Sequence, residues 1–108
     1  MGFDVRTISV FERQAKRLLK KFPSLKNEIQ ILITQLKEEP EKGTFIGNGC
    51  YKIRLSIASK GRGKSGGARV ITHFMIRENT VYLLSIYDKS DIENLSDSEI
   101  IALVKMIP

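Results

Sequence analysis

The sequence predicts a small α+β domain in which a mostly antiparallel sheet packs on helices, and a single domain over residues 1–108. Three observations support this class. The first forty residues carry two apolar stripes at helical spacing, three strand-like runs follow, and a short capped helix comes last. Helices and strands that are grouped along the chain in this way are typical of α+β domains. A hydrophobic content of 42% and a charged content of 28% are values of a globular chain.

The N-terminal half is predicted to hold one strand and two helices. Residues 4–9 alternate weakly between polar and apolar and predict a short strand. Ser9 and Glu12 then have the spacing of a capping box, which marks a helix start. Apolar residues recur every three or four positions in the segments 11–22 and 25–38, which a Phe-Pro-Ser turn separates. We expect two helices in an antiparallel hairpin, and all helices on one face of the sheet.

The C-terminal half is predicted to hold the sheet. The glycine-rich residues 41–49 predict a loop. The strand-like runs that follow are residues 50–58, 68–77 and 80–88, and Glu78-Asn79 is the expected hairpin turn between the last two. A second capping box, Ser96 to Glu99, predicts a final helix that extends to about residue 107.

Positive charge is concentrated in one window of the sequence. Between Glu41 and Glu78 there are eight Lys or Arg residues and no Asp or Glu, whereas the rest of the chain has ten basic and twelve acidic residues. The net charge of +6 therefore arises inside this window. Charge gathered in this way predicts a binding surface for a polyanion.

Strand alternation divides the basic window into two parts. Alternate residues of a strand share one face, so apolar Tyr51, Ile53, Leu55 and Ile57 should meet the helices. The opposite, open face then collects Lys52, Arg54, Arg69, His73, Tyr87 and Lys89, whereas Lys60, Arg62 and Lys64 lie on a glycine-rich loop beside it. An ordinary solvated sheet face would mix acids with these bases, and this face has none. The pattern favours a phosphate-binding surface over a solvated face.

Other classes of site and location have little support in the sequence. Cys50 has no second cysteine to pair with, and no His, Asp or Glu cluster has metal-ligand spacing, so neither a metal site nor a cofactor is expected. The apolar runs are too short to span a membrane, and the N-terminus lacks the layout of a signal peptide. We therefore expect a cytoplasmic protein without a membrane partner.

Four stretches resemble the RelE/HigB family of bacterial toxin endoribonucleases. They are Cys50 to Leu55, the Gly-Gly-Ala-Arg-Val-Ile run at 66–71, Val81 to Ile86, and Tyr87 to Asp91. The long glycine-rich loop between the first two is similar to the HigB-like branch. The resemblance covers nearly the whole chain and implies the toxin of a type II toxin-antitoxin system, which a cognate antitoxin neutralises. It also implies metal-independent cleavage of mRNA in the ribosomal A site, beside 16S-type ribosomal RNA.

The family's functional basic residues match Lys52, Arg54, Arg69 and Lys89. Leu95 stands where RelE-type members carry a tyrosine, so Tyr87, on the same expected face, is a candidate to replace that tyrosine.

The same residues suit cleavage of RNA by its own 2′-hydroxyl. Arg54 and Arg69 would stabilise charge on the phosphate, since guanidinium groups make forked contacts to phosphate oxygens. Lys52 lies among positive neighbours, which lower the pKa of a lysine and suit it to act as the general base. Lys89 or Tyr87 would protonate the leaving oxygen. The remaining candidates are expected to hold the RNA or ribosomal RNA: Lys60, Arg62, Lys64 and His73.

Two other functions remain open at this point. A ParE-like inhibitor of DNA gyrase would share the fold but should lack the basic residues of the open face. A non-catalytic nucleic-acid-binding module would bind RNA or DNA without cutting it, although this sequence has few aromatic residues of the kind that stack on RNA bases.

Overall fold

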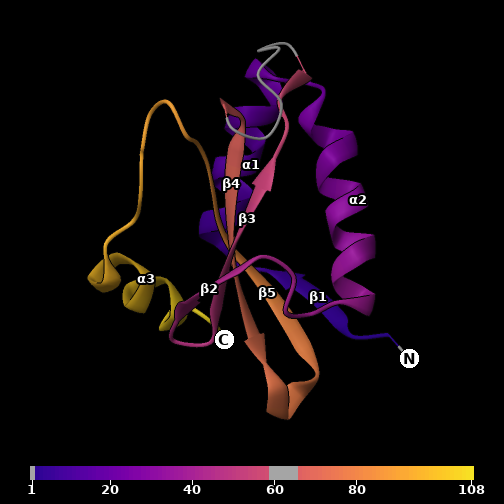
Figure 1. Ribbon diagram of the computed structural model, residues 1–108, viewed down its shortest axis with the longest axis vertical. Coiled ribbons are helices and arrows are strands. Elements are labelled where there is room, and N and C mark those ends of the chain that lie inside the picture. Colours follow the sequence, from indigo (N-terminus) through magenta and orange to yellow (C-terminus); the bar gives the residue numbers. More distant parts are fainter. Residues whose placement is uncertain (1, 59–65) are drawn as a thin grey trace.

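The computed structural model describes residues 2–58 and 66–108 and confirms the α+β class. The five strands form one sheet in the order β1-β5-β4-β3-β2 (Figure 1). The elements are β1 (Asp4–Thr7), α1 (Ser9–Lys21), α2 (Leu25–Glu38), β2 (Thr44–Gly47), β3 (Cys50–Leu55), β4 (Ala68–Met75), the 3-10 turn η3 (Ile76–Glu78), β5 (Thr80–Asp88) and α3 (Asp97–Val104). Among these helices none is long and apolar enough to cross a membrane.

The sheet is mixed, because β1 runs parallel to β5 whereas the other neighbours are antiparallel. The sequence places β2 in a loop, and this prediction is wrong: residues 44–47 form an edge strand beside β3. Three consecutive residues with positive φ, Gly47 (88°), Asn48 (55°) and Gly49 (70°), make the turn between the two strands. Glycine and asparagine are the residues that tolerate this backbone region, so a glycine-rich stretch here encodes a hairpin turn.

The two predicted capping boxes have different outcomes. The one at Ser9 is wrong, because α1 begins at Ser9 itself and its N-cap, Ile8, makes no side-chain cap. The backbone N–H of Ile8 is held by the carbonyl of Leu83, so the chain stays extended until this residue. The second box is confirmed: Ser96 Oγ accepts from the backbone N–H of Glu99 at 3.2 Å, and Ser96 N donates to Glu99 Oε1 at 2.9 Å.

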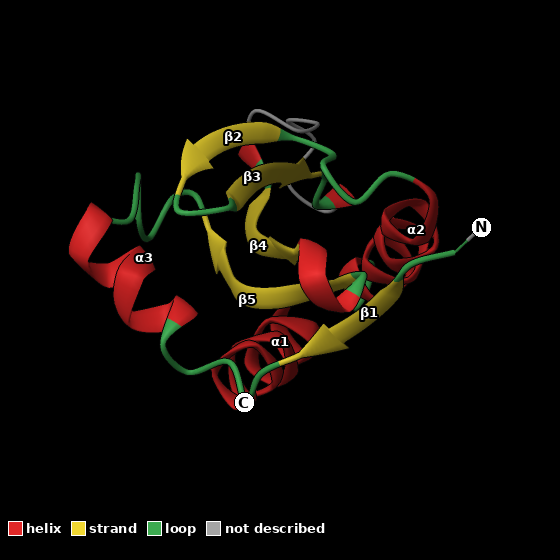
Figure 2. Ribbon diagram, turned by 90° about the horizontal axis from the view of Figure 1, so that it is seen from below, coloured by secondary structure: helices red, strands yellow, loops and turns green. Residues whose placement is uncertain are grey.

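Helices lie on both sides of the sheet. The helix α2 contributes fully buried Leu25, Leu32 and Leu36 to the core, and it lies across the sheet from α3 in both views (Figures 1 and 2). The expectation that all helices share one face therefore holds for α2 but not for α3. The short apolar stripe of α3, with Ile100 buried, covers sheet area that strand alternation alone leaves open.

The helix α1 continues along the edge of β5 after β1 ends. Gln14 of α1 takes the place of a neighbouring strand, because its Oε1 accepts from Ser85 Oγ and from the backbone N–H of Ile86, both at 3.0 Å. A buried backbone N–H without a partner would destabilise the fold. Gln14 thus fixes the half of β5 that carries the predicted site residues.

A register shift in β5 inverts part of the predicted alternation. Ile71 pairs with Ser85, but the next residue of β4 pairs with Leu83, so Leu84 is skipped. An extra residue of this kind moves every side chain beyond it to the other face. The predicted open-face position of Tyr87 is therefore confirmed. Alternation without this skip would place Tyr82 on the helix face with Ile86, whereas Tyr82 pairs with His73 on the opposite face.

Gly67, the residue immediately before β4, provides a test of the fold. A methyl group on Gly67 would lie 1.9 Å from the backbone oxygen of Leu55, so Gly67→Ala should force the two strands apart. We expect the free energy of unfolding to fall by about 1–3 kcal/mol, as for other overpacked sites. Urea unfolding followed by circular dichroism measures this change. Gly2→Ala is the matched control, since its methyl group meets nothing within 4 Å; equal stability of the two variants would contradict this packing.

Candidate functional site

Three of the predicted site residues form a row across three neighbouring strands. Arg54 of β3 lies directly opposite Arg69 of β4, and Arg69 lies directly opposite Tyr87 of β5. Directly paired residues point to the same face with Cβ atoms about 5 Å apart. We call Arg54, Arg69 and Tyr87 the cross-strand row. Lys52 of β3 lies two residues before Arg54 and pairs with Ile71 of β4, so its side chain is on the same face as the cross-strand row.

The two arginines of the row have different environments. Arg54 is exposed, whereas the Arg69 side chain is only 3% exposed and its Nη1 donates to the Ala68 carbonyl at 3.1 Å. Burial lowers the pKa of the Arg69 guanidinium from its usual value, the positive charge of Arg54 lowers it further, and Tyr87 acts in the opposite direction. An arginine keeps its proton at neutral pH in spite of such effects. The row therefore holds one fixed, buried cation and one exposed cation.

Tyr87 brings a buried hydroxyl to the end of the row. Its side chain is 5% exposed, and its hydroxyl has no hydrogen-bond partner among the residues that the structure describes. Burial raises the pKa of the Tyr87 phenol above its usual value, and the adjacent Arg69 partly offsets this effect. The hydroxyl is therefore protonated at neutral pH and is able to donate to an acceptor that enters the site.

The C-terminal segment covers part of the face that the sequence predicts to be open. A cavity of about 210 Å³ lies between the sheet and this segment, and Lys52, Tyr87 and Ile100 contribute to its wall. Lys52 Nζ donates to Asn94 Oδ1 at 3.0 Å, a contact that joins β3 to the segment before α3. The cause of the difference is the apolar face of α3, which buries Ile100 against the sheet.

Two further residues of this cavity bear on the sequence predictions. Leu95, which the resemblance aligns with a tyrosine of RelE-type members, lines the same cavity as Tyr87. Asp97 also lines it, so the prediction of an acid-free face holds for the strands but not for the segment that covers them. Strand alternation did not identify Asn94 or Asp97. The capping box at Ser96 was the sequence signal that could have identified them, because it predicts a helix start next to Asn94 and Asp97.

The other predicted basic residues are more dispersed. Lys89 is exposed directly after β5, where its backbone N–H donates to the Gly67 carbonyl at 3.1 Å. Three of them, Lys60, Arg62 and Lys64, fall outside the described residues, so their binding to RNA remains a prediction.

His73 lies at the other end of β4, away from the cross-strand row. It pairs with Cys50, and its Nδ1 is 3.6 Å from Cys50 Sγ. Burial raises the pKa of the Cys50 thiol to about 11, so the sulfur is protonated at neutral pH and unreactive. Cys50 is a buried free thiol at the first residue of β3. The structure does not bring His73 together with Arg54 and Arg69.

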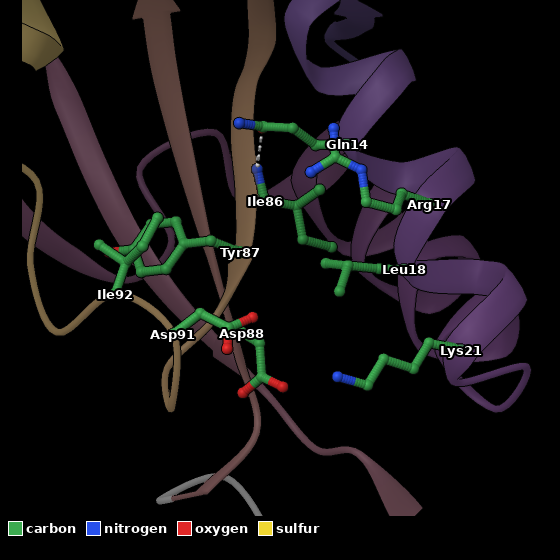
Figure 3. A pocket seen from close by; sticks show the side chains of 9 residues that line it. All are labelled: Gln14, Arg17, Leu18, Lys21, Ile86, Tyr87, Asp88, Asp91 and Ile92. Carbon is green, nitrogen blue, oxygen red and sulfur yellow. Dashed lines mark hydrogen bonds between the residues drawn. The ribbon is translucent and has the colours of Figure 1, made fainter.

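A second cavity of about 250 Å³ adjoins the row from the side of α1 (Figure 3). Lys21 of α1 points toward Asp88 and Asp91 across it, Arg17 lies beside Gln14, and Tyr87 lies at the border with the first cavity. Asp88 is buried at the end of β5, and its Oδ1 accepts from the backbone N–H of Ser90 at 3.0 Å and from the Ser90 hydroxyl at 2.8 Å. These contacts fix the turn that leads from the row to Lys89.

The described part of the site has donors for an anion and no cluster of metal ligands. Residues 2–58 and 66–108 contain no group of three His, Cys, Asp or Glu side chains that is able to hold a metal ion. The guanidinium groups of the row, the Lys52 ammonium and the Tyr87 hydroxyl are all hydrogen-bond donors. Such a set is complementary to a phosphate group.

Comparison with known proteins identifies the family. The family described as the RelE toxin of the RelE/RelB toxin-antitoxin system matches residues 8–107. This chain belongs to the RelE toxin family, as its resemblance to RelE/HigB toxins predicts.

Solved structures agree on the fold. A free-state mutant of the Escherichia coli toxin RelE, with two arginines replaced by alanine, is 17% identical with a TM-score of 0.63 and 100% of each chain covered. The RelBE2 toxin-antitoxin complex of Mycobacterium tuberculosis matches at 16% identity and a TM-score of 0.59, over 84% of this chain and 95% of that one. A metal-bound toxin from Helicobacter pylori matches at 17% identity and a TM-score of 0.53, over 83% and 98%.

The unpartnered Tyr87 hydroxyl makes a testable contribution to stability. A buried polar group without a partner costs about 1–3 kcal/mol, so Tyr87→Phe should raise the free energy of unfolding by about 1 kcal/mol. Urea denaturation measures this change in the free energy of unfolding. Tyr82→Phe is the matched control, because the Tyr82 hydroxyl donates to Glu78 Oε1 at 2.9 Å and its loss should lower stability. A loss of stability in Tyr87→Phe would mean that this hydroxyl has a partner.

Proposed function

We propose that this protein is the toxin of a type II toxin-antitoxin system and a metal-independent endoribonuclease, which cleaves mRNA in the A site of the ribosome and so inhibits translation. The observation that carries the proposal is the cross-strand row, which sets two arginines and a protonated tyrosine side by side. Family membership supports the toxin role. Because ribosomes are its proposed target, the protein would act in the bacterial cytoplasm.

The proposed reaction needs no nucleophile from the protein. The 2′-hydroxyl of the RNA attacks the adjacent phosphorus, the bond to the 5′-oxygen breaks, and the products are a 2′,3′-cyclic phosphate and a free 5′-hydroxyl. Arg54 and Arg69 stabilise the additional negative charge on the phosphate oxygens in the transition state. A fixed donor such as buried Arg69 costs little reorganisation when that charge develops.

Proton transfer is assigned to three residues. Lys52, whose side chain lies on the same face as the row, takes the proton of the 2′-hydroxyl as a neutral amine, once its contact with Asn94 opens. Tyr87 gives a proton to the departing 5′-oxygen, which its place in the row and its unpartnered hydroxyl support. Lys89, exposed after β5, is the other candidate for this second role.

A cognate antitoxin is the proposed regulatory partner. The RelBE2 structure is described as a toxin-antitoxin complex, which supports a partner of this kind here. Exposed apolar side chains on and near α3 offer it contact area: Ile92 (39% exposed), Ile101 (39%) and Met106 (50%). An antitoxin that engages this segment would act on the same element that covers the row.

The exposed arginine of the row is the best position for a functional test. Arg54→Ala removes a phosphate donor without touching the core, and we expect mRNA cleavage on purified translating ribosomes to fall about 10²–10³-fold. Growth arrest on expression should be lost in parallel. The readout is primer extension on the ribosome-bound mRNA.

Arg77→Ala is the matched control, since Arg77 is also exposed but lies at the far end of the β4–β5 hairpin. It should cleave within about twofold of the unmodified protein. Full cleavage by Arg54→Ala would overturn the site assignment. A protein that makes no cuts but blocks gyrase supercoiling would instead be a gyrase inhibitor, and one that binds RNA without either effect would be a binding module.

A further inference from the structure

The outer face of α1 carries a second basic surface that the charge window does not include. Its five basic residues follow the spacing i, i+3, i+4, i+7, i+8, so they lie along one side of the helix. We call Arg13, Lys16, Arg17, Lys20 and Lys21 the α1 stripe. All five side chains are exposed, and the buried residues of α1, Phe11, Ala15 and Leu18, occupy the opposite side. Segment 13–21 contains no acid.

Arg17 and Lys21 of the α1 stripe share a cavity with Asp88 and Asp91, but the stripe is not engaged in ion pairs with the described protein. None of its five residues forms an ion pair with residues 2–58 or 66–108; the ion pair found in these ranges joins Arg6 to Asp4. Like charges three and four positions apart on a helix repel one another. The exposed side of α2 differs, since there Lys26 and Lys37 are mixed with Glu38 and several uncharged polar residues. A basic helix face is therefore a particular property of α1.

The chemistry of the α1 stripe fits a phosphate backbone better than a protein or a lipid surface. Protein interfaces depend on buried aromatic or aliphatic anchors, and membrane-surface helices insert apolar side chains. The exposed large apolar residues of the described chain are Ile31, Phe45, Ile76, Ile92, Ile101 and Met106, and none lies on α1. A row of cations without apolar anchors gains its binding energy from charge neutralisation and counterion release, as in contacts with nucleic-acid phosphates.

The α1 stripe also reaches the candidate site. Arg17 and Lys21 line the cavity of about 250 Å³ that Tyr87 borders, so the last turns of α1 lie next to the cross-strand row (Figure 3). Arg13, Lys16 and Lys20 extend away from this cavity along the helix. A structured RNA in contact with these residues would lie beside the strand that is cut.

We propose that the α1 stripe binds the phosphate backbone of ribosomal RNA and docks the toxin on the ribosome, separately from the residues that cleave. This inference rests on the proposed function for the identity of the RNA. It assigns affinity and its salt dependence to Arg13, Lys16 and Lys20, and the chemical step to the cross-strand row.

Binding to mRNA-free ribosomes as a function of salt tests the inference. The test variant is Arg13→Gln, Lys16→Gln, Lys20→Gln, and the control, Lys26→Gln, Lys37→Gln, Arg77→Gln, removes the same charge from exposed positions elsewhere. The test variant should lose at least about tenfold in affinity, and its slope of log K against log salt should shrink by about 2–3, since each lost phosphate contact contributes about 0.7–0.9. The control should stay within about twofold with an unchanged slope. Circular dichroism checks that both variants remain folded.

The outcomes separate this inference from the proposed function. In cleavage assays the test variant should need more ribosomes for half-maximal rate, whereas Arg54→Ala should bind normally and cut slowly. Unchanged affinity and slope in the test variant, or an equal loss in the control, would overturn the inference. A test variant that binds polyglutamate more weakly than the unmodified protein does, but binds ribosomes equally well, would also overturn the inference. That result would indicate an acidic protein as the partner of the α1 stripe. If the unmodified protein binds ribosomes through the α1 stripe but cuts no mRNA, the inference stands and the proposed nuclease function is rejected.

Discussion

Arg54 and Arg69 are paired on neighbouring strands of one sheet face, and the surrounding structure has to stabilise two cations there. Like charges directly opposite each other in a sheet are destabilising, and burying a charged side chain adds a desolvation cost. The Ala68 carbonyl accepts a hydrogen bond from the Arg69 guanidinium, and Gln14 fixes the part of β5 that backs the row. The fold thus holds two cations at directly paired positions on one face of the sheet.

The C-terminal segment adds a second constraint, because it places a cover over the same face. Ile100 packs against the sheet and Asn94 accepts from Lys52, so the proposed base is engaged in the free protein. An RNA phosphate held at Lys52, as proposed, would replace this contact. The cover and the proposed catalytic residues would therefore compete, which would give a physical basis for control by any partner that moves α3.

Local patterns made most of the fold predictable, and the exceptions have identifiable causes. The helix pair, the three main strands and the capping box at Ser96 follow from short-range periodicity and side-chain caps. The edge strand β2 and the skipped Leu84 depend on pairing between distant segments, which no local pattern records. In the candidate site, alternation correctly placed Arg54, Arg69 and Tyr87 together, but it could not show that α3 covers them. The α1 stripe did not stand out in the sequence for another reason. The net charge of the residues outside the basic window also includes the acids near α2 and α3, which offset the five basic residues of α1.

In the proposed reaction, the cross-strand row acts on an RNA phosphate that the 2′-hydroxyl of the adjacent ribose attacks. Analysis of the product ends by mass spectrometry, after incubation of the purified toxin with mRNA-programmed ribosomes, tests it most directly. The expected products are a 2′,3′-cyclic phosphate, or the 3′-phosphate formed when that ring opens, together with a 5′-hydroxyl. A 3′-hydroxyl with a 5′-phosphate would contradict it, because water would then be the nucleophile and the assigned roles of Lys52 and Tyr87 would fail.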